Sequence, residues 1–262
     1  MYSNHTPQGA SRPPVLLKGR IAFVTGAGQG NGREIAIGLH RAGAQVVVTD
    51  IDAAAIEDTL AVIRNESGTG WAFQLDVTQP GDCLALAAHI GQHIGRVDLL
   101  VNNAGILIRE GSDSPRAAAN WQRVMDVNVN GTFNVTQAFL PALRSGGGTI
   151  LNIASTAAFV GQAGSLAYSP SKGAIKMYTQ SLASELAKDG VRVNALAPGL
   201  IETPMTIATR ENPETLARFL NRIPMGRAGH PAELVGPAVF LSSSMSDYVT
   251  GVTLPVDGGR LA

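Results

Sequence analysis

The sequence predicts an α/β fold in which one parallel β-sheet carries helices on both of its faces. Apolar runs of about five residues alternate along the chain with longer amphipathic stretches. These short runs are almost wholly apolar, so neither face of a sheet built from them can meet water. Parallel neighbours also require long crossover connections, which the amphipathic stretches supply as helices. Together, the alternation and the strand composition indicate a doubly wound sheet.

Seven strands and six intervening helices account for the chain from Lys18 onward. The predicted strands are Ile21–Thr25, Gln45–Thr49, Trp71–Leu75, Asp98–Asn102, Gly148–Ile153, Val191–Leu196 and Val252–Val256. The predicted helices are Gly30–Ala42, Ala53–Asn65, Pro80–Ile94, Asn120–Arg144, Leu166–Lys188 and Ala232–Ser242. Because no linker or repeat interrupts this pattern, residues 18–262 are expected to form one domain. Residues 1–17, rich in proline and small polar residues, are expected to be a flexible tail.

Composition excludes several classes of function. The chain has 262 residues, of which 45% are hydrophobic, and its formal net charge is zero. A neutral chain gives no electrostatic support for sequence-independent binding to nucleic acid or to an anionic membrane. No apolar run approaches the roughly 20 residues of a membrane-spanning helix. The chain has a single cysteine, Cys83, which excludes an internal disulfide. The lack of both a disulfide and a secretion-signal pattern predicts a cytoplasmic protein.

A glycine-rich segment, Val24–Gly32, joins the first predicted strand to the first predicted helix. It has a Thr-Gly-x-x-x-Gly-x-Gly spacing, and a literal G-x-G-x-x-G is absent because Asn31 and Arg33 occupy the required glycine positions. Glycines let a pyrophosphate approach the backbone, and the free N–H groups at the helix start face its negative charge. The segment therefore predicts a dinucleotide site, with a tight turn that binds no ligand as the alternative.

A serine, a tyrosine and a lysine follow in an order that suits proton transfer. Ser155 comes after the fifth predicted strand, and Tyr168 and Lys172 lie four residues apart in the next helix, on one face of it. Pro170 is tolerated only in a first turn, which places this pair at the helix start. Taken singly, each residue has an ordinary alternative: a capping serine, a surface tyrosine or a solvated lysine.

These motifs resemble the short-chain dehydrogenase/reductase family. The glycine spacing and the Ser…Tyr-x-x-x-Lys order match that family, as do Asn-Asn-Ala-Gly at residues 102–105 and Asp-Gly-Gly at residues 257–259. The resemblance covers about residues 18–260 and implies a Rossmann-type sheet with a nicotinamide dinucleotide cofactor. The chain departs from the family at Asn31, where an aliphatic residue is usual.

An acidic residue, Asp50, ends the second predicted strand and predicts NAD as the cofactor. A carboxylate at this position would accept hydrogen bonds from the adenosine ribose hydroxyls and repel a 2′-phosphate. NADP-dependent members of the resembled family often carry a compensating cation at the positions of Gln29 and Ile51, which are uncharged here. The alternative is that Asp50 caps the next helix, although Asp52 could do so instead.

The resemblance also implies a role for each matching residue. Tyr168 would take the proton of the substrate hydroxyl, Ser155 would hold the substrate oxygen, and Lys172 would lower the pKa of the tyrosine and bind the nicotinamide ribose. Asn128 would hold a water molecule behind the lysine, with a local helix break as the alternative. Asp76 could equally form only a turn before the third helix. The implied cofactor contacts are Gly26, Gln29, Gly30, Asn31, Asp50, Asp76, Val77, Asn103, Tyr168, Lys172, Ile201 and Thr203.

The expected effect of Lys172 on Tyr168 is large. A free tyrosine titrates near pH ~10, too high for a base at neutral pH. An ammonium group about 4 Å away, at an effective dielectric constant of about 20, would favour the phenolate by roughly 4 kcal/mol, or about three pKa units. Burial opposes this shift, and an oxidised nicotinamide would reinforce it.

The sequence thus predicts an NAD-dependent oxidoreductase that interconverts a secondary alcohol and its ketone. An apolar substrate pocket is expected from residues 106–108, 159–160 and Met205, with hydroxyl contacts from Gln162 and Ser165. Residues 204–226 are expected to form a lid. The alternatives are an NADP-dependent 3-oxoacyl or ketone reductase and a dinucleotide-binding sensor without turnover.

Two further expectations concern assembly and metals. The resemblance implies a homotetramer or homodimer formed through the fourth and fifth predicted helices or the last helix and strand. No metal site is predicted, because His89 and His93, four residues apart on a helix, have no obvious third ligand.

Overall fold

One sheet of seven strands forms the centre of the protein, whose structure, a computed structural model, describes residues 16–262. The strands are β1 Ile21–Thr25, β2 Gln45–Asp50, β3 Gly70–Gln74, β4 Leu99–Asn102, β5 Thr149–Ile153, β6 Arg192–Pro198 and β7 Thr253–Val256. They lie in the order β3-β2-β1-β4-β5-β6-β7, and every neighbouring pair is parallel. The predicted doubly wound α/β sheet is therefore confirmed.

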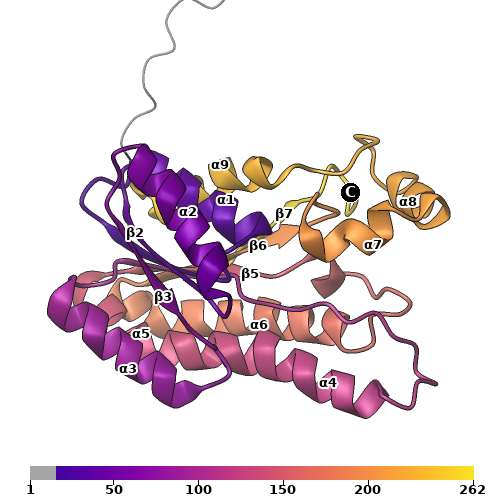
Figure 1. Ribbon diagram of the computed structural model, residues 1–262, viewed down its shortest axis with the longest axis horizontal. Coiled ribbons are helices and arrows are strands. Elements are labelled where there is room, and N and C mark those ends of the chain that lie inside the picture. The colour runs from indigo at the N-terminus through magenta and orange to yellow at the C-terminus, as the bar shows by residue number, and fades with distance from the viewer. Residues whose placement is uncertain (1–15) are drawn as a thin grey trace, which may run out of the picture.

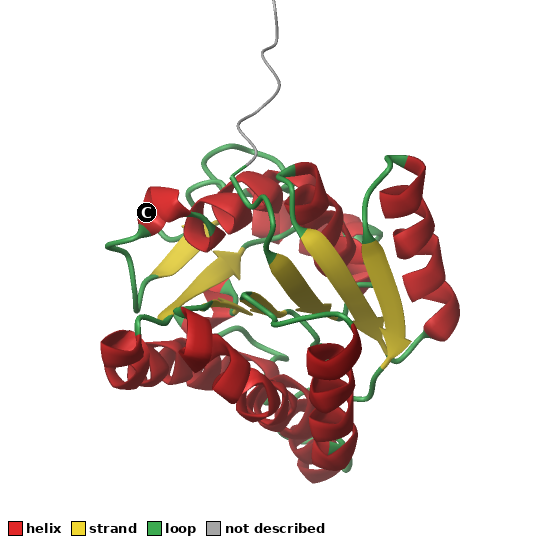
Figure 2. Ribbon diagram, turned by 90° about the vertical axis from the view of Figure 1, so that its left-hand side faces the viewer, coloured by secondary structure: helices red, strands yellow, loops and turns green. Residues whose placement is uncertain are grey.

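Helices cover both faces of the sheet (Figure 1, Figure 2). One face carries α1 Gly30–Arg41, α2 Ala53–Asn65 and α9 Val235–Ser242. The other carries α3 Pro80–His93, α4 Ala117–Met125, α5 Thr132–Gly146 and α6 Tyr168–Leu186. The short helices α7 Ile207–Arg210 and α8 Pro213–Leu220 follow β6 and lie at one end of the sheet (Figure 1).

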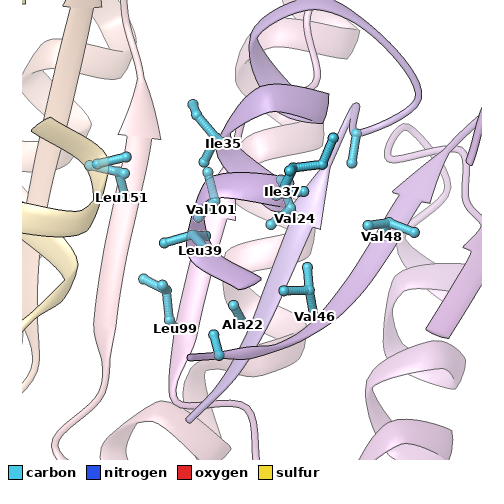
Figure 3. Close-up of a cluster of buried hydrophobic side chains, with 14 of the residues drawn as sticks. Ala22, Val24, Ile35, Ile37, Leu39, Val46, Val48, Leu99, Val101 and Leu151 are labelled. Carbon is cyan, nitrogen blue, oxygen red and sulfur yellow. The ribbon is translucent and has the colours of Figure 1, made fainter. Parts of the chain in front are cut away.

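The five inner strands are buried on both faces, as their apolar composition predicts, whereas the edge strands β3 and β7 are partly exposed. In β1, Ala22 and Val24 belong to the cluster under α1, while Ile21 and Phe23 belong to the cluster on the opposite face. Figure 3 shows the first cluster, where side chains of α1 lie against those of β1, β2 and β4. Successive strand residues point to opposite faces, so each short strand anchors two layers of helices.

The long helix predicted over Asn120–Arg144 is divided. A π-helical turn over Asp126–Gly131 separates α4 from α5. Within this turn, the side-chain amide of Asn128 bonds to the backbone N–H and C=O of Ile106, at 2.8 and 3.0 Å. This contact joins segments that are distant in the sequence, so helical periodicity does not reveal it. π-Helical turns frequently occur at functional sites.

The other predicted elements begin and end within three residues of the observed bounds. Leu17, which was assigned to the tail, is fully buried, and its N–H donates to the carbonyl oxygen of Ala42 at 2.9 Å. Residues 1–15 of that tail lie outside the described residues. Across residues 16–262, no helix combines the length and apolarity that crossing a bilayer requires.

Candidate active site

The loop between β1 and α1 needs glycine at two positions. Gly26 has a φ of +61°, and a Cβ added there would lie 2.9 Å from the Cα of Ala104. A Cβ at Gly32 would lie 2.1 Å from the carbonyl oxygen of Gly26. The side-chain amide of Asn103 donates to the carbonyl oxygens of Thr25 and Gly26, at 3.0 and 2.8 Å. The end of β4 therefore fixes the path of the glycine loop.

The start of α1 is suited to an anion. Its N-cap residue, Gln29, makes no side-chain hydrogen bond to the helix, and the first turn contains no acidic residue. The first N–H groups of α1 are therefore available to phosphate oxygens. The loop borders a cavity of about 360 Å³, here named the glycine-loop pocket, whose lining includes Gly26, Gln29, Gly30, Asn31, Asp50, Asp76, Val77, Asn103 and Thr203. These residues fit a dinucleotide at the carboxyl ends of the strands.

Asp50 lies in the glycine-loop pocket and does not cap α2. Its Oδ2 accepts a hydrogen bond from the N–H of Gly28 at 3.0 Å, and its Oδ1 accepts one from the N–H of Asp52 at 3.2 Å. Asp52 is the cap of α2, since its carboxylate accepts from Ala54 and Ala55. Within the described part of the chain, no basic side chain forms an ion pair with Asp50.

Asp76 fits both of its interpretations. Its Oδ1 accepts from the N–H and the hydroxyl of Thr78, at 2.9 and 2.8 Å, which forms a turn before α3. Asp76 and the adjacent Val77 also line the glycine-loop pocket. Asn31 lines the same pocket, and its buried Oδ1 has no hydrogen-bond partner among the described residues.

A second cavity adjoins the first and contains the predicted proton-transfer residues. This tyrosine pocket is lined by Ser155, Tyr168 and Lys172, among others. The two pockets share five lining residues: Asn31, Asn103, Gly105, Thr203 and Met205. Thr203, an implied cofactor contact, therefore lies where the two pockets join, and Ile201, another implied contact, lines the tyrosine pocket.

The three residues predicted to take part in proton transfer come from the end of β5 and the start of α6. Ser155 follows β5, and its hydroxyl accepts from the N–H of Ala157 at 3.1 Å. Lys172 is only 5% exposed, its Nζ donates to the carbonyl oxygen of Ile153 at 2.7 Å, and it lies 5.8 Å from the ring centre of Tyr168. Tyr168 is the first residue of α6, so Pro170 falls in the first turn as predicted.

The pKa of Tyr168 is shifted in the opposite direction to the one expected. Burial of its hydroxyl raises this pKa, while a hydrogen bond to Ser155 and the charge of Arg109 oppose the rise. Burial also lowers the pKa of Lys172 to about 8. Burial was expected to oppose the effect of Lys172, and it is the dominant contribution to the pKa of Tyr168.

Asn128 is a structural neighbour of Lys172. Asn128 is 1% exposed, and besides Ile106 its amide bonds to the hydroxyl of Ser171 at 3.0 Å. A Cβ added to Gly105 would lie 3.2 Å from the Oδ1 of Asn128 and 3.4 Å from the Nζ of Lys172. The π-helical turn thus places Asn128 beside Gly105, where Lys172 also lies.

The predicted apolar lining of the substrate pocket is wrong in part. Leu107, Gln162 and Met205 line the tyrosine pocket, whereas the exposed pair Phe159 and Val160 lies outside it. Ser165 is buried elsewhere, with its hydroxyl unpaired among the described residues.

The residues that line this pocket also include Arg109 and Arg260, which were not predicted, and Phe219 from the predicted lid. They come from three segments far apart in the sequence, so no local spacing connects them. The only signal was the position of each arginine just beyond a matched motif, residues 102–105 and 257–259.

The two histidines of α3 stack on each other. The rings of His89 and His93 have centres 4.4 Å apart. In the described part of the chain, no group of three His, Cys, Asp or Glu side chains is placed to hold a metal ion.

A parallel sheet with a pocket at its glycine loop, beside a half-buried tyrosine and a buried lysine, defines a dinucleotide-dependent oxidoreductase. The chain belongs to the short-chain dehydrogenase/reductase family. A family model described as enoyl-(acyl carrier protein) reductase matches residues 26–260. The chain is 42% identical over 248 residues to a 2-dehydro-3-deoxy-D-gluconate 5-dehydrogenase of Bacillus subtilis, covering 94% of this chain and 96% of that relative. It is 40% identical over 253 residues to a galactitol 2-dehydrogenase (L-tagatose-forming) of Cereibacter sphaeroides, covering 95% and 97%.

A solved structure supports the same family and fold. A gluconate 5-dehydrogenase from Burkholderia cenocepacia, in complex with NADP and tartrate, superposes with a TM-score of 0.90 at 35% identity, covering 94% of this chain and 97% of that one. The protein is therefore a nicotinamide-dinucleotide oxidoreductase of this family.

Proposed function

We propose that the protein interconverts a secondary alcohol and its ketone with NAD(H), using Tyr168 as the general acid and base. The observation that carries this proposal is the convergence of Ser155, Tyr168 and Lys172 in a cavity that joins the glycine-loop pocket. When bound, the nicotinamide accepts a hydride in oxidation and returns it in reduction.

Each of the three side chains has a distinct task. In oxidation, Tyr168 takes the hydroxyl proton of the substrate while the carbinol carbon loses its hydride and the carbonyl double bond forms. Ser155 holds the substrate oxygen beside the phenol. Lys172, with a pKa of about 8, still carries its charge at neutral pH and favours the phenolate over the phenol. Asn128 positions the segment behind Lys172 through Ile106 and Ser171.

The proposal of NAD rests on Asp50, and solved relatives supply the competing candidate. The gluconate 5-dehydrogenase structure contains NADP, as does the RhlG complex of Pseudomonas aeruginosa, which is 35% identical with a TM-score of 0.89. In this chain, the uncompensated carboxylate of Asp50 would repel a 2′-phosphate. Comparison of the two cofactors with the wild-type protein decides between them.

A substrate panel tests the proposed activity. Oxidation of secondary alcohols and reduction of ketones, followed by the absorbance of NADH and NADPH, should identify at least one compound that is turned over. Tight NADH binding without turnover of any alcohol or ketone would instead support a sensor that retains only the fold.

Residues 204–226 are proposed to act as a lid over both pockets. Pro204 and Met205 line the glycine-loop pocket, and Thr206 and Phe219 line the tyrosine pocket. A segment that borders both cavities can exclude water when cofactor and substrate are bound. Saturating NADH should slow proteolysis within this segment, and an unchanged rate would contradict the proposed lid.

The protein is also proposed to be a cytoplasmic homo-oligomer. Large apolar side chains lie exposed on the helices of one sheet face: Trp121 on α4, Phe133 on α5 and Met177 on α6. Pairing of these helices between copies would remove them from water. Light scattering should give a dimer or tetramer, and a monomer at micromolar concentration would contradict this assembly.

A further inference from the structure

The similarity to known proteins does not determine whether the substrate carries a charge. The relatives that match this chain at 42% and 40% identity are named for an acidic sugar derivative and for the uncharged polyol galactitol. Whether the substrate is charged must therefore be inferred from the side chains that line the tyrosine pocket.

Arg260 lines the tyrosine pocket with an incomplete set of hydrogen bonds. Its Nε and Nη1 are shielded from solvent and have no acceptor among the described residues. The neighbouring carboxylate of Asp257 accepts from the N–H groups of Gly259 and Leu261 at 2.9 and 3.0 Å, and within the described chain it forms no ion pair with Arg260. Burial lowers the pKa of Arg260, because desolvation destabilises the charged guanidinium.

Arg192, a structural arginine of the same protein, makes the hydrogen bonds that Arg260 lacks. Arg192 is also half-buried, but its guanidinium donates to the carbonyl oxygens of Leu241 and Ser243 and to the hydroxyl of Ser246, each at 3.0 Å. Buried donors are normally paired in this way. The contrast indicates that Arg260 lacks an acceptor that a ligand would bring.

The guanidinium groups of Arg109 and Arg260 both lie over the ring of Phe219. The Cζ of Arg109 is 5.7 Å from the ring centre of Phe219, and the Cζ of Arg260 is 5.2 Å from it. Arg109 donates to the hydroxyl of Thr209 at 3.2 Å and forms no ion pair within the described chain. Arg109 lines the tyrosine pocket together with Tyr168, and its charge opposes the rise in the pKa of that tyrosine.

The charges of the pocket are all of one sign. Among its described lining residues, Arg109, Lys172 and Arg260 are basic, and none is acidic. We propose that Arg109 and Arg260 bind a carboxylate of the substrate, so that the alcohol to be oxidised belongs to a hydroxy acid. Guanidinium groups match carboxylates with paired hydrogen bonds, and a desolvated site strengthens each of them.

The proposed carboxylate site rests on the proposed function, and matched substrates test it. D-gluconate and D-glucitol differ only by a carboxylate in place of a hydroxymethyl group at C1, and further aldonate and alditol pairs vary the configuration. With saturating NAD, kcat/KM should be at least tenfold higher for the aldonate of the best pair. Arg260→Met should reduce kcat/KM for that aldonate by about 100-fold and change it for the alditol by less than threefold.

A variant on the surface of α2 controls for the loss of charge. Arg64 is exposed in the last turn of that helix, outside the lining of both pockets and outside the proposed lid. Arg64→Met removes the same charge and should leave both activities within threefold. NADH affinity checks that each variant is folded, and Arg109→Met serves as a second test if Arg260→Met fails to fold.

Binding separates the carboxylate site from the redox activity. In calorimetry with the Tyr168→Phe protein and saturating NAD, an aldonate should bind at least tenfold more tightly than its alditol. Absence of turnover for every alcohol and ketone, with this preference intact, would refute only the proposed function. Equal binding of the two classes, or an effect of Arg260→Met on both alike, would overturn the carboxylate site. Tighter binding of D-glucitol 6-phosphate than of any aldonate would overturn it in favour of a phosphate.

Discussion

Replacement of Asp50 by asparagine tests the predicted preference for NAD. Asp50→Asn keeps the size of the side chain and an oxygen that accepts from the N–H of Gly28, but it removes the charge. A 2′-phosphate carries a charge of about −1.5 to −2. At about 5 Å from a carboxylate, the repulsion is about 1 kcal/mol in a medium as polar as water and about 5 kcal/mol at an effective dielectric constant of about 20.

The half-exposed position of Asp50 lies between these two limits. The ratio of kcat/KM for NAD over that for NADP should therefore fall by about tenfold or more in Asp50→Asn, as a gain for NADP and a loss of ribose binding for NAD. The assay compares both cofactors at one alcohol concentration and one ionic strength, because salt screens this repulsion.

Asp52→Asn is the matched control. It removes the same charge two residues away, and asparagine still caps α2, so the cofactor ratio should change by less than about twofold. A wild-type protein that prefers NADP, or an unchanged ratio in Asp50→Asn, would refute the role assigned to this carboxylate.

Three further predictions concern the remaining parts of the site. The rate of alcohol oxidation should rise with pH as Tyr168 loses its proton. The charge of Arg109 lowers the pKa of Tyr168, so Arg109→Met should raise that pKa and move the rise in rate to higher pH. A pH profile of kcat/KM that does not move would contradict this effect. Gly32→Ala should abolish NADH binding measured by fluorescence, since its Cβ would collide with the glycine loop, whereas Gly81→Ala, in open space on α3, should leave binding intact. Asn128→Ala should reduce the free energy of unfolding by about 1–3 kcal/mol in urea titrations, because buried groups of Ile106 lose their partners; equal stability would show that the π-helical turn does not depend on this amide.

Features that depend on neighbours in the sequence were predictable. The strands follow from apolar runs, and Tyr168 and Lys172 follow from their spacing on one helix face, with Pro170 fixing the start of α6. The choice between Asp50 and Asp52 as the cap of α2 needed the structure, because both carboxylates precede that helix.

Features that depend on tertiary contacts were not predictable. The π-helical turn follows from the bonds between Asn128 and Ile106, which belong to separate segments. The raised pKa of Tyr168 follows from burial, which a sequence does not report for a single hydroxyl group. Arg109 and Arg260 come from distant segments, and each guanidinium lies over the ring of Phe219, on α8.

The proton transfer assigned to Tyr168 is tested most directly by removal of its hydroxyl group. Tyr168→Phe should lower kcat for alcohol oxidation by at least about 100-fold while NADH still binds, because only the general base is lost. Tyr178→Phe, on the same helix and outside the lining of both pockets, should retain kcat within about threefold. Turnover by Tyr168→Phe at the wild-type rate would contradict the mechanism.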